Sequence, residues 1–122
     1  MKSRSFLTLF VDLKPENILM DGEGNIKIND FGLSNVMKLG LFLETSCGSP
    51  LYSPPEIISG STYIGPEVDI WAMGVIIYAM VCGYLPWEGR DVNEQIEHVV
   101  RGNYKTPSWV SECNRFFCFL AY

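Results

Sequence analysis

The hydrophobic positions of this chain gather into one long central run, with shorter patterned segments on either side. The long run, from Ile70 to Trp87, is almost wholly apolar. Pro66 and Asp69 suit the first turn of a helix, and Gly83 suits its exit. The pattern predicts a helix from about Pro66 to Cys82, and a helix that is apolar on all sides is buried inside a protein. A membrane span is the weaker alternative, because the run falls just short of the roughly 20 residues that a bilayer requires.

Two short β-prone runs earlier in the chain predict a hairpin. Ile18 to Met20 and Ile26 to Ile28 are joined by Asp21-Gly22-Glu23-Gly24-Asn25, a connection rich in residues that tolerate positive φ. From Asp30 to Glu56 the hydrophobic positions have no sustained period, and Gly, Ser, Thr, Pro and Asn lie between them. This stretch predicts a long ordered loop, and loops of such length are usually functional or disordered.

A second helix is predicted after the corner formed by Leu85, Pro86 and Trp87. Asp91 can cap its first turn, with Glu94 three residues further on. Gly102 ends the pattern. Four apolar residues fall on one face of this helix: Val92, Ile96, Val99 and Val100. The segment is therefore predicted to be an amphipathic surface helix.

Composition and charge exclude several classes of function. Of the 122 residues, 48% are hydrophobic and 19% are charged, which is typical of a globular protein and not of a disordered tail. The formal net charge is −5, and the basic residues are scattered singly. Such a surface has no positive stripe for a phosphate backbone, so we expect neither nucleic acid nor a membrane as a partner.

The cysteines and the N-terminal residues indicate the compartment. No metal-ligand or disulfide spacing relates the four cysteines, Cys47, Cys82, Cys113 and Cys118. The apolar stretch from Phe6 to Val11 is too short for a secretory signal. We therefore expect a reducing compartment, the cytoplasm, with the nucleus as the alternative.

Two motifs carry the chemistry. Val11-Asp12-Leu13-Lys14-Pro15-Glu16-Asn17 is followed by Asp30-Phe31-Gly32, at the spacing that a short hairpin imposes. Together they resemble the catalytic loop and the metal-binding motif of protein kinases. Phosphoryl transfer needs a carboxylate to orient the attacking hydroxyl and oxygen ligands to hold Mg²⁺. Asp12 or Asn17 alone would more often be a turn residue, whereas the ordered set argues for the chemistry.

The resemblance implies a role for each of these residues. Asp12 would be the catalytic base, and Lys14 would contact the transferring phosphate, as the corresponding lysine does in serine/threonine kinases. Glu16 would attract a basic residue of the protein substrate. The Mg²⁺ ligands would be Asn17 and Asp30. The ATP site would be lined by Lys14, Asn17, Leu19 and Asp30.

Later motifs extend the resemblance. The run from Thr45 to Glu56 looks like the end of an activation segment, and the run from Ile64 to Gly74 matches the long buried helix of the kinases. By this resemblance Ser49 would bond Asp12 and Lys14 and contribute to catalysis. Thr45 would be phosphorylated by an upstream activating kinase. Glu56 and Asp69 would be structural residues, Asp69 by bonding to the backbone of the catalytic loop.

The motifs are most similar to the AMP-activated and sucrose-non-fermenting kinase family, in the calmodulin-kinase-like group. This likeness spans about Val11 to Cys113. Phe10 and Val11 stand where the family has histidine and arginine. We therefore divide the chain into an atypical segment (1–10), a partial kinase domain (11–113) and an atypical tail (114–122), and expect a chain that is cut short at both ends.

The expected fold class is α+β, a partial protein kinase-like fold with a mostly helical C-terminal lobe and a short β-hairpin. The expected function is ATP-dependent phosphorylation of serine or threonine in a protein substrate, with ATP and Mg²⁺ as cofactors. We expect the chain to be inactive by itself, because the sequence has no glycine-rich loop. The alternative is a non-catalytic kinase fragment that acts as a binding module, or the product of a mispredicted gene.

Overall fold

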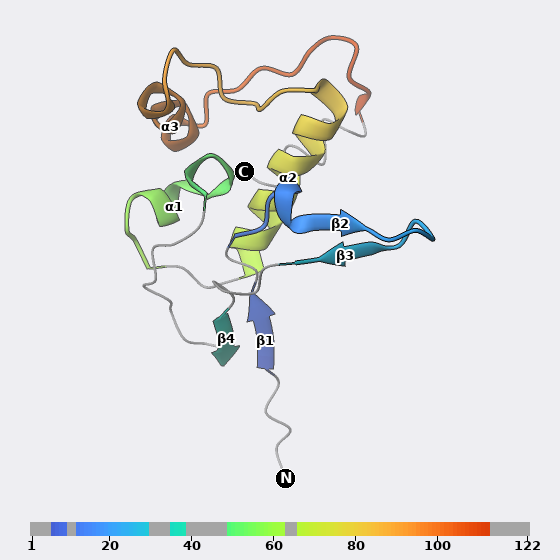
Figure 1. Ribbon diagram of the computed structural model, residues 1–122. Coiled ribbons are helices and arrows are strands. Elements are labelled where there is room, and N and C mark those ends of the chain that lie inside the picture. Colours follow the sequence, from blue (N-terminus) through green and yellow to red (C-terminus); the bar gives the residue numbers. More distant parts are fainter. Residues whose placement is uncertain (1–5, 10–11, 30–34, 39–48, 63–65, 113–122) are drawn as a thin grey trace.

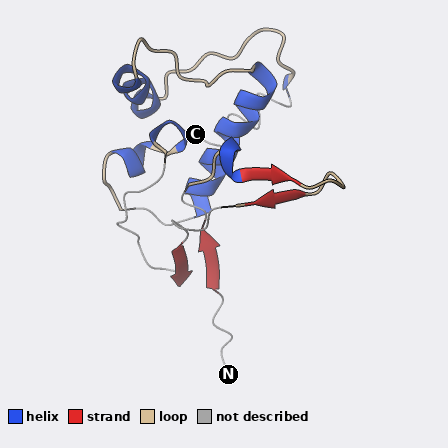
Figure 2. Cartoon of the chain, viewed as in Figure 1, coloured by secondary structure: helices blue, strands red, loops and turns tan. Residues whose placement is uncertain are grey.

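A computed structural model describes residues 6–9, 12–29, 35–38, 49–62 and 66–112. The described elements are, in order, β1 (Phe6–Leu9), η1 (Pro15–Asn17), β2 (Ile18–Met20), β3 (Ile26–Ile28), β4 (Asn35–Lys38), η2 (Pro50–Tyr52), α1 (Pro55–Ile58), α2 (Pro66–Cys82) and α3 (Val92–Arg101). Helix α2 runs between the β2–β3 hairpin on one side and α1 and α3 on the other (Figure 1). Figure 2 shows the helices together with two separate small sheets, which is the predicted α+β class.

Helix α2 spans the predicted residues, and it begins with acidic residues in its first turn. Its exit is made by Gly83, which has a φ of 82° and donates its N–H to the carbonyl of Ala79 at 2.8 Å. Among the described residues, no helix is both long enough and apolar enough to cross a membrane. Helix α2 ends at Cys82, before the apolar run ends at Trp87.

The prediction that α2 is buried on all sides is wrong for the described part of the chain. One side of the helix is buried, and it carries six buried apolar residues: Val68, Trp71, Ala72, Val75, Ile76 and Tyr78. The opposite side is open, with Ile70 and Met73 exposed and Met80 77% exposed. The physical reason is that none of the described elements covers the side of the helix that carries Ile70, Met73 and Met80. Burial depends on what packs against a helix as well as on its composition.

The predicted hairpin is confirmed. Strands β2 and β3 are antiparallel, with Ile18 opposite Ile28 and Met20 opposite Ile26. These four side chains share one face, because they alternate with Leu19 and Lys27 along the strands. Only Ile18 reaches the core, where it packs against a cluster of Leu13, Ala72 and Ile76. The hairpin projects away from α2 into solvent (Figure 1).

The predicted loop from Asp30 to Glu56 contains regular structure within its described parts. Strand β4 pairs with β1 in an antiparallel register that places Phe6 opposite Lys38. A 3-10 turn, η2, begins at Pro50, and the short helix α1 begins at Pro55. The periodicity missed these elements, because a four-residue strand is specified by its distant partner and a single turn is too short to show a period.

Helix α3 has both of the predicted caps. The Asp91 side chain accepts a hydrogen bond from the Glu94 backbone N–H at 2.9 Å, and Gly102 ends the helix with a φ of 65°. Glu94 in turn accepts hydrogen bonds from the backbone N–H and the side chain of Arg90. Of the predicted apolar face, Val99 is completely buried. Ile96 is half-buried, but Val92 and Val100 are 54% and 45% exposed, so the predicted apolar face is wrong at these two positions and the helix is anchored mainly through Val99.

One hydrophobic cluster of buried residues in the described part of the chain is a group that we call the tryptophan cluster: Trp71, Val75, Trp87 and Val99. The rings of Trp71 and Trp87 are stacked, with centroids 5.9 Å apart and planes inclined by 10°. Leu51, Tyr52 and Tyr104 pack around the cluster. The cluster thus joins α2, α3 and the turn η2 into one unit.

Candidate active site

Three polar side chains meet beside the N-terminal end of η1. The Lys14 ammonium lies 2.7 Å from one carboxylate oxygen of Asp12 (Oδ2). The other oxygen, Oδ1, accepts hydrogen bonds from the backbone N–H and the hydroxyl of Ser49, both at 2.9 Å. Lys14 also donates to the Ser49 hydroxyl at 3.1 Å. The contacts expected between Ser49, Asp12 and Lys14 are therefore present, although Ser49 lies 37 residues beyond Asp12.

These contacts favour the ionised form of Asp12. Partial burial alone would raise the pKa of the Asp12 carboxyl. Hydrogen bonds from Lys14 and Ser49, together with the positive charge of Lys14, outweigh that effect and lower the pKa below its ordinary value. At neutral pH Asp12 is therefore a carboxylate, and its oxygens are held in a fixed direction.

Asn17 joins this group from the end of η1. Its side chain is buried, with 7% exposed, and its amide nitrogen donates to the Asp12 carbonyl at 2.9 Å. A longer contact of 3.5 Å runs from the same nitrogen to Asp12 Oδ2. The backbone carbonyl of Asn17 accepts from the N–H of Asn29, next to the end of β3, at 2.7 Å. The hairpin thus returns next to the segment that carries Asp12 and Asn17.

Asn17 is the predicted Mg²⁺ ligand that lies within the described residues. With its nitrogen used for Asp12, the Asn17 side chain has its amide oxygen left as an acceptor, and amide oxygens are ligands that hard cations such as Mg²⁺ accept. Within the described ranges, no group of three His, Cys, Asp or Glu side chains could hold a metal ion. The second predicted ligand, Asp30, lies outside the described residues, as does Thr45.

The other predicted site residues that the structure describes lie on η1, β2, α1 and α2. Leu19 is 48% exposed on the hairpin face opposite to the core, and Glu16 is exposed in η1. Glu56 is half-buried in α1, and its backbone carbonyl accepts from Ser61 at 2.8 Å. Asp69 is half-buried in the first turn of α2. The structure brings Asp12, Lys14, Asn17 and Ser49 together and leaves Leu19 and Glu16 facing solvent.

One supporting residue at the site was not predicted. Ser53 is buried, and its hydroxyl donates to the carbonyl of Ser49 at 3.0 Å. The N–H of Tyr52 donates to the same carbonyl at 2.9 Å. The sequence offered one signal, which is that Ser53 precedes two prolines and closes a turn that Pro50 begins.

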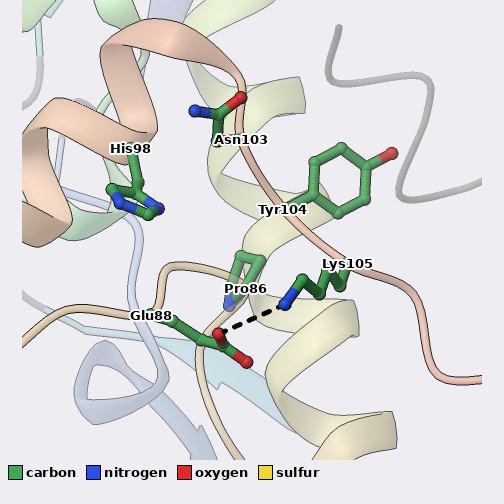
Figure 3. Close-up of a pocket in the computed structure, with 6 residues that line it drawn as sticks. All are labelled: Pro86, Glu88, His98, Asn103, Tyr104 and Lys105. Carbon is green, nitrogen blue, oxygen red and sulfur yellow. Dashed lines mark ion pairs between the residues drawn. The ribbon is translucent and has the colours of Figure 1, made fainter.

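A shallow groove of about 320 Å³ lies elsewhere, between the loop after α2 and the end of α3 (Figure 3). It is lined by Pro86, Glu88, His98, Asn103, Tyr104 and Lys105. Glu88 and Lys105 face each other across it at 3.9 Å, and both are largely exposed. None of the predicted site residues lines this groove, so the groove is separate from the hydrogen-bonded group around Asp12.

Comparison with known proteins agrees with the resemblance carried by the motifs. The protein kinase domain family matches residues 5–116, a somewhat longer stretch than the 11–113 expected from the motifs. The chain is 56% identical over 100 residues to the probable serine/threonine-protein kinase MARK-C of Dictyostelium discoideum, covering 82% of this chain and 13% of that protein. It is 56% identical over 104 residues to the SNF1-related protein kinase catalytic subunit alpha KIN12 of Arabidopsis thaliana, covering 85% of this chain and 21% of that protein.

A third relative is the carbon catabolite-derepressing protein kinase of Candida tropicalis, 53% identical over 100 residues, which are 82% of this chain and 16% of that protein. The chain therefore spans about a fifth or less of the length of these three relatives. The similarity to SNF1-related serine/threonine kinases agrees with the likeness seen in the motifs. Because the family match covers most of the chain and the catalytic-loop residues are assembled, the chain belongs to the protein kinase domain family.

Proposed function

We propose that this chain forms the lower half of the phosphoryl-transfer centre of an ATP-dependent protein serine/threonine kinase. The observation that carries the proposal is the contact of the Asp12 carboxylate with both Lys14 and Ser49. Protein kinases generally use ATP and Mg²⁺ and act on protein substrates. For this chain, the cofactors and the substrate class are part of the proposal, because it covers only a fraction of its relatives.

Asp12 is the group that orients the attacking hydroxyl and accepts its proton. A carboxylate that is ionised at neutral pH can accept a hydrogen bond from the serine or threonine of a substrate. Ser49 holds Oδ1 through two hydrogen bonds, so that Oδ2 is directed toward Lys14. This arrangement supports catalysis by positioning, which is the main protein contribution to phosphoryl transfer.

Lys14 is the group that meets the negative charge of the transferring phosphoryl group. Its ammonium is held between Asp12 and Ser49, close to where the attacking hydroxyl would lie. Positive charge that is fixed in advance stabilises the charge that develops in the transition state. Lys14 and Asp12 therefore act on the two reacting partners from one rigid loop.

Asn17 and Asp30 would hold Mg²⁺, and Leu19 would lie beneath the adenine of ATP. When bound, Mg²⁺ neutralises the charge of the triphosphate. Glu16, exposed beside the site, would select a basic residue in the substrate. Phosphorylation of Thr45 by an upstream kinase would add about −1.5 to −2 charges to the activation segment. A cytoplasmic location, with the nucleus as the alternative, is proposed on the absence of disulfide spacing.

The test is a chimaera in which residues 12–112 of this chain replace the matching segment of the Arabidopsis relative, which is 56% identical. We expect the chimaera to phosphorylate peptides, and Asp12→Asn to lower kcat by about 10²- to 10⁴-fold. Asp21→Asn, in the exposed hairpin loop, is the matched control and should retain activity. A chimaera that is active with Asn at position 12 would refute the role of Asp12.

The purified 122-residue chain is expected to transfer no measurable phosphate by itself. It contains no G-x-G-x-x-G run to cover the phosphates, and catalysis by positioning needs both sides of the nucleotide to be held. A radiolabelled phosphate assay with Asp12→Ala as the control measures this directly. Incorporation that depends on Asp12 would show that these residues suffice.

A second candidate function is that of a non-catalytic binding module. It is favoured by the exposure of large apolar side chains on the hairpin, namely Leu19, Met20 and Ile26. The two functions differ in their need for nucleotide. We expect the isolated chain to bind Mg²⁺-ATP more weakly than about 1 mM, and calorimetric titration would measure this.

A further inference from the structure

A hydrogen bond between distant parts of the chain links the tryptophan cluster to the candidate site. The indole N–H of Trp87 donates to the backbone carbonyl of Leu51 at 3.0 Å, across 36 residues. Trp87 is 2% exposed. A hydrogen bond made in such surroundings is not exchanged readily for one with water, so it holds its acceptor in place.

The indole ring itself is fixed from several sides. It stacks on Trp71, and the edge of Tyr104 meets it with ring centroids 6.2 Å apart. The backbone carbonyl of Trp87 accepts from the side-chain amide of Gln95, on α3, at 3.4 Å. The direction of the indole N–H is therefore set by α2 and α3 before it meets Leu51.

The acceptor belongs to the turn that carries Ser49. Leu51 is the middle residue of η2, and Ser49 is the residue that precedes the turn. The carbonyl of Ser49 accepts from the Tyr52 N–H and from the Ser53 hydroxyl. Because these bonds close a single compact turn, a displacement of Leu51 is passed to Ser49.

Ser49 in turn meets the catalytic carboxylate. Its N–H and its hydroxyl both donate to Asp12 Oδ1. We infer that Trp87 is a positioning residue, whose indole N–H sets the place of the η2 turn and thereby the two hydrogen bonds from Ser49 to Asp12. The inference rests on the proposed function for its relevance to catalysis, but the coupling itself is a property of the chain and can be measured without activity.

The test compares two variants of the 122-residue chain, each of which removes one donor and keeps an aromatic ring. Trp87→Phe removes the hydrogen bond to Leu51. Tyr78→Phe is the matched control, since the Tyr78 hydroxyl donates to the carbonyl of Lys105 at 2.7 Å, away from η2. The readout is amide hydrogen exchange of Ser49, followed by NMR on ¹⁵N-labelled protein and divided by the exchange of the α2 amides.

We expect Trp87→Phe to raise the relative exchange rate of the Ser49 amide by about tenfold, as the loss of one hydrogen bond of ordinary strength would do. Tyr78→Phe should leave this ratio unchanged. A purely structural role for Trp87 would raise exchange at Ser49 and in α2 alike, so an unchanged ratio in Trp87→Phe overturns the inference. An equal rise in the two variants also overturns it.

A second replacement keeps the test decisive if the smaller phenyl ring disturbs packing. In 3-benzothienylalanine a sulfur atom takes the place of the indole N–H, while the bicyclic shape is retained. This residue at position 87 should reproduce the tenfold rise at Ser49, and exchange like that of the native chain would refute the role of the N–H. The proposed kinase function is tested separately by the chimaera, so either idea can fail without the other.

Discussion

The tryptophan cluster and the strands of the β2–β3 hairpin are both rich in apolar residues but have opposite surroundings. In the cluster, Val99 is completely buried, and aromatic rings from separate elements meet. In the hairpin, Met20 is 74% and Ile26 is 70% exposed. Burial, and not hydrophobicity alone, determines how much a side chain stabilises the fold. We therefore expect the cluster to open only with the whole chain and the hairpin to open locally.

The candidate site lies where these two regions meet. Asp12 and Asn17 come from the loop that leads into the hairpin, whereas Ser49 comes from the turn held by the cluster. The side packed by the tryptophan cluster therefore supplies the two Ser49 donors, and the hairpin side supplies the Asp12 carboxylate. Three of the following experiments pair a change on the cluster side with a matched change on the hairpin side, and the last compares Asp12, at the junction, with an aspartate of the hairpin loop.

The largest contrast is expected for truncation to alanine. Trp87→Ala removes a buried ring from the cluster and should lower the free energy of unfolding by about 3–5 kcal/mol. Met20→Ala, at a position of the hairpin that is 74% exposed, should change it by less than about 0.5 kcal/mol. Urea denaturation followed by circular dichroism measures both. Equal losses in the two variants would show that the hairpin is part of the same cooperative core.

The next contrast concerns two glycines. A Cβ atom at Gly89 would lie 2.8 Å from the backbone nitrogen of Gln95, so Gly89→Ala should cost about 1–3 kcal/mol through overpacking against α3. In the hairpin loop, a Cβ at Gly22 would meet nothing within 4 Å. Gly22→Ala should therefore be neutral or slightly stabilising, by at most about 1 kcal/mol. Thermal unfolding of the two variants decides between steric conflict and a general cost of losing glycine.

Local signals in the sequence were enough to predict three elements. Helix α2, helix α3 and the hairpin were found because caps, glycines and β-prone runs act over a few residues. Strand β4 was missed because its partner β1 is distant in the sequence, and the turn η2 was missed because a single turn is too short to show a period. Local sequence patterns therefore predict the elements whose signals lie close together in the chain, and they do not predict elements that depend on tertiary contacts.

The same limit applies to the candidate site. The contact between Ser49 and Asp12 was expected only from the resemblance to kinases, since no periodicity relates residues 37 positions apart. The bond from Trp87 to Leu51 was not expected at all. It depends on the stacking of Trp87 on Trp71, and that stacking exists only once α2 and the following loop have packed.

A smaller contrast is expected for two aspartates that accept backbone hydrogen bonds. Asp91→Ala removes the N-cap of α3 and should lower the free energy of unfolding by about 1 kcal/mol. Asp21 accepts from the N–H groups of Glu23 and Asn25 in the hairpin loop. Asp21→Ala should therefore speed amide exchange in that loop with little change in global stability. Global loss from Asp21→Ala equal to that from Asp91→Ala would contradict a locally opening hairpin.

The smallest effect is expected from pH, at the carboxylate where the two regions meet. Hydrogen bonds from Lys14 and Ser49 outweigh burial and lower the folded-state pKa of Asp12 below its ordinary value of 3.8. As pH falls, the unfolded chain takes up the proton first, so the stabilisation from Asp12 is complete above the unfolded pKa and is lost as pH falls through the folded pKa. Urea midpoints measured from neutral pH down to about pH 3 should fall more steeply for the native chain than for Asp12→Asn, which cannot titrate.

Asp21→Asn is the control from the hairpin. Hydrogen bonds from Asn25 lower the pKa of Asp21 as well, but its loop opens locally, so this variant should keep the steep native slope. Parallel curves for the native chain and Asp12→Asn would mean that the Ser49 and Lys14 contacts do not persist in solution, and the junction between the two regions would then be open in the free chain.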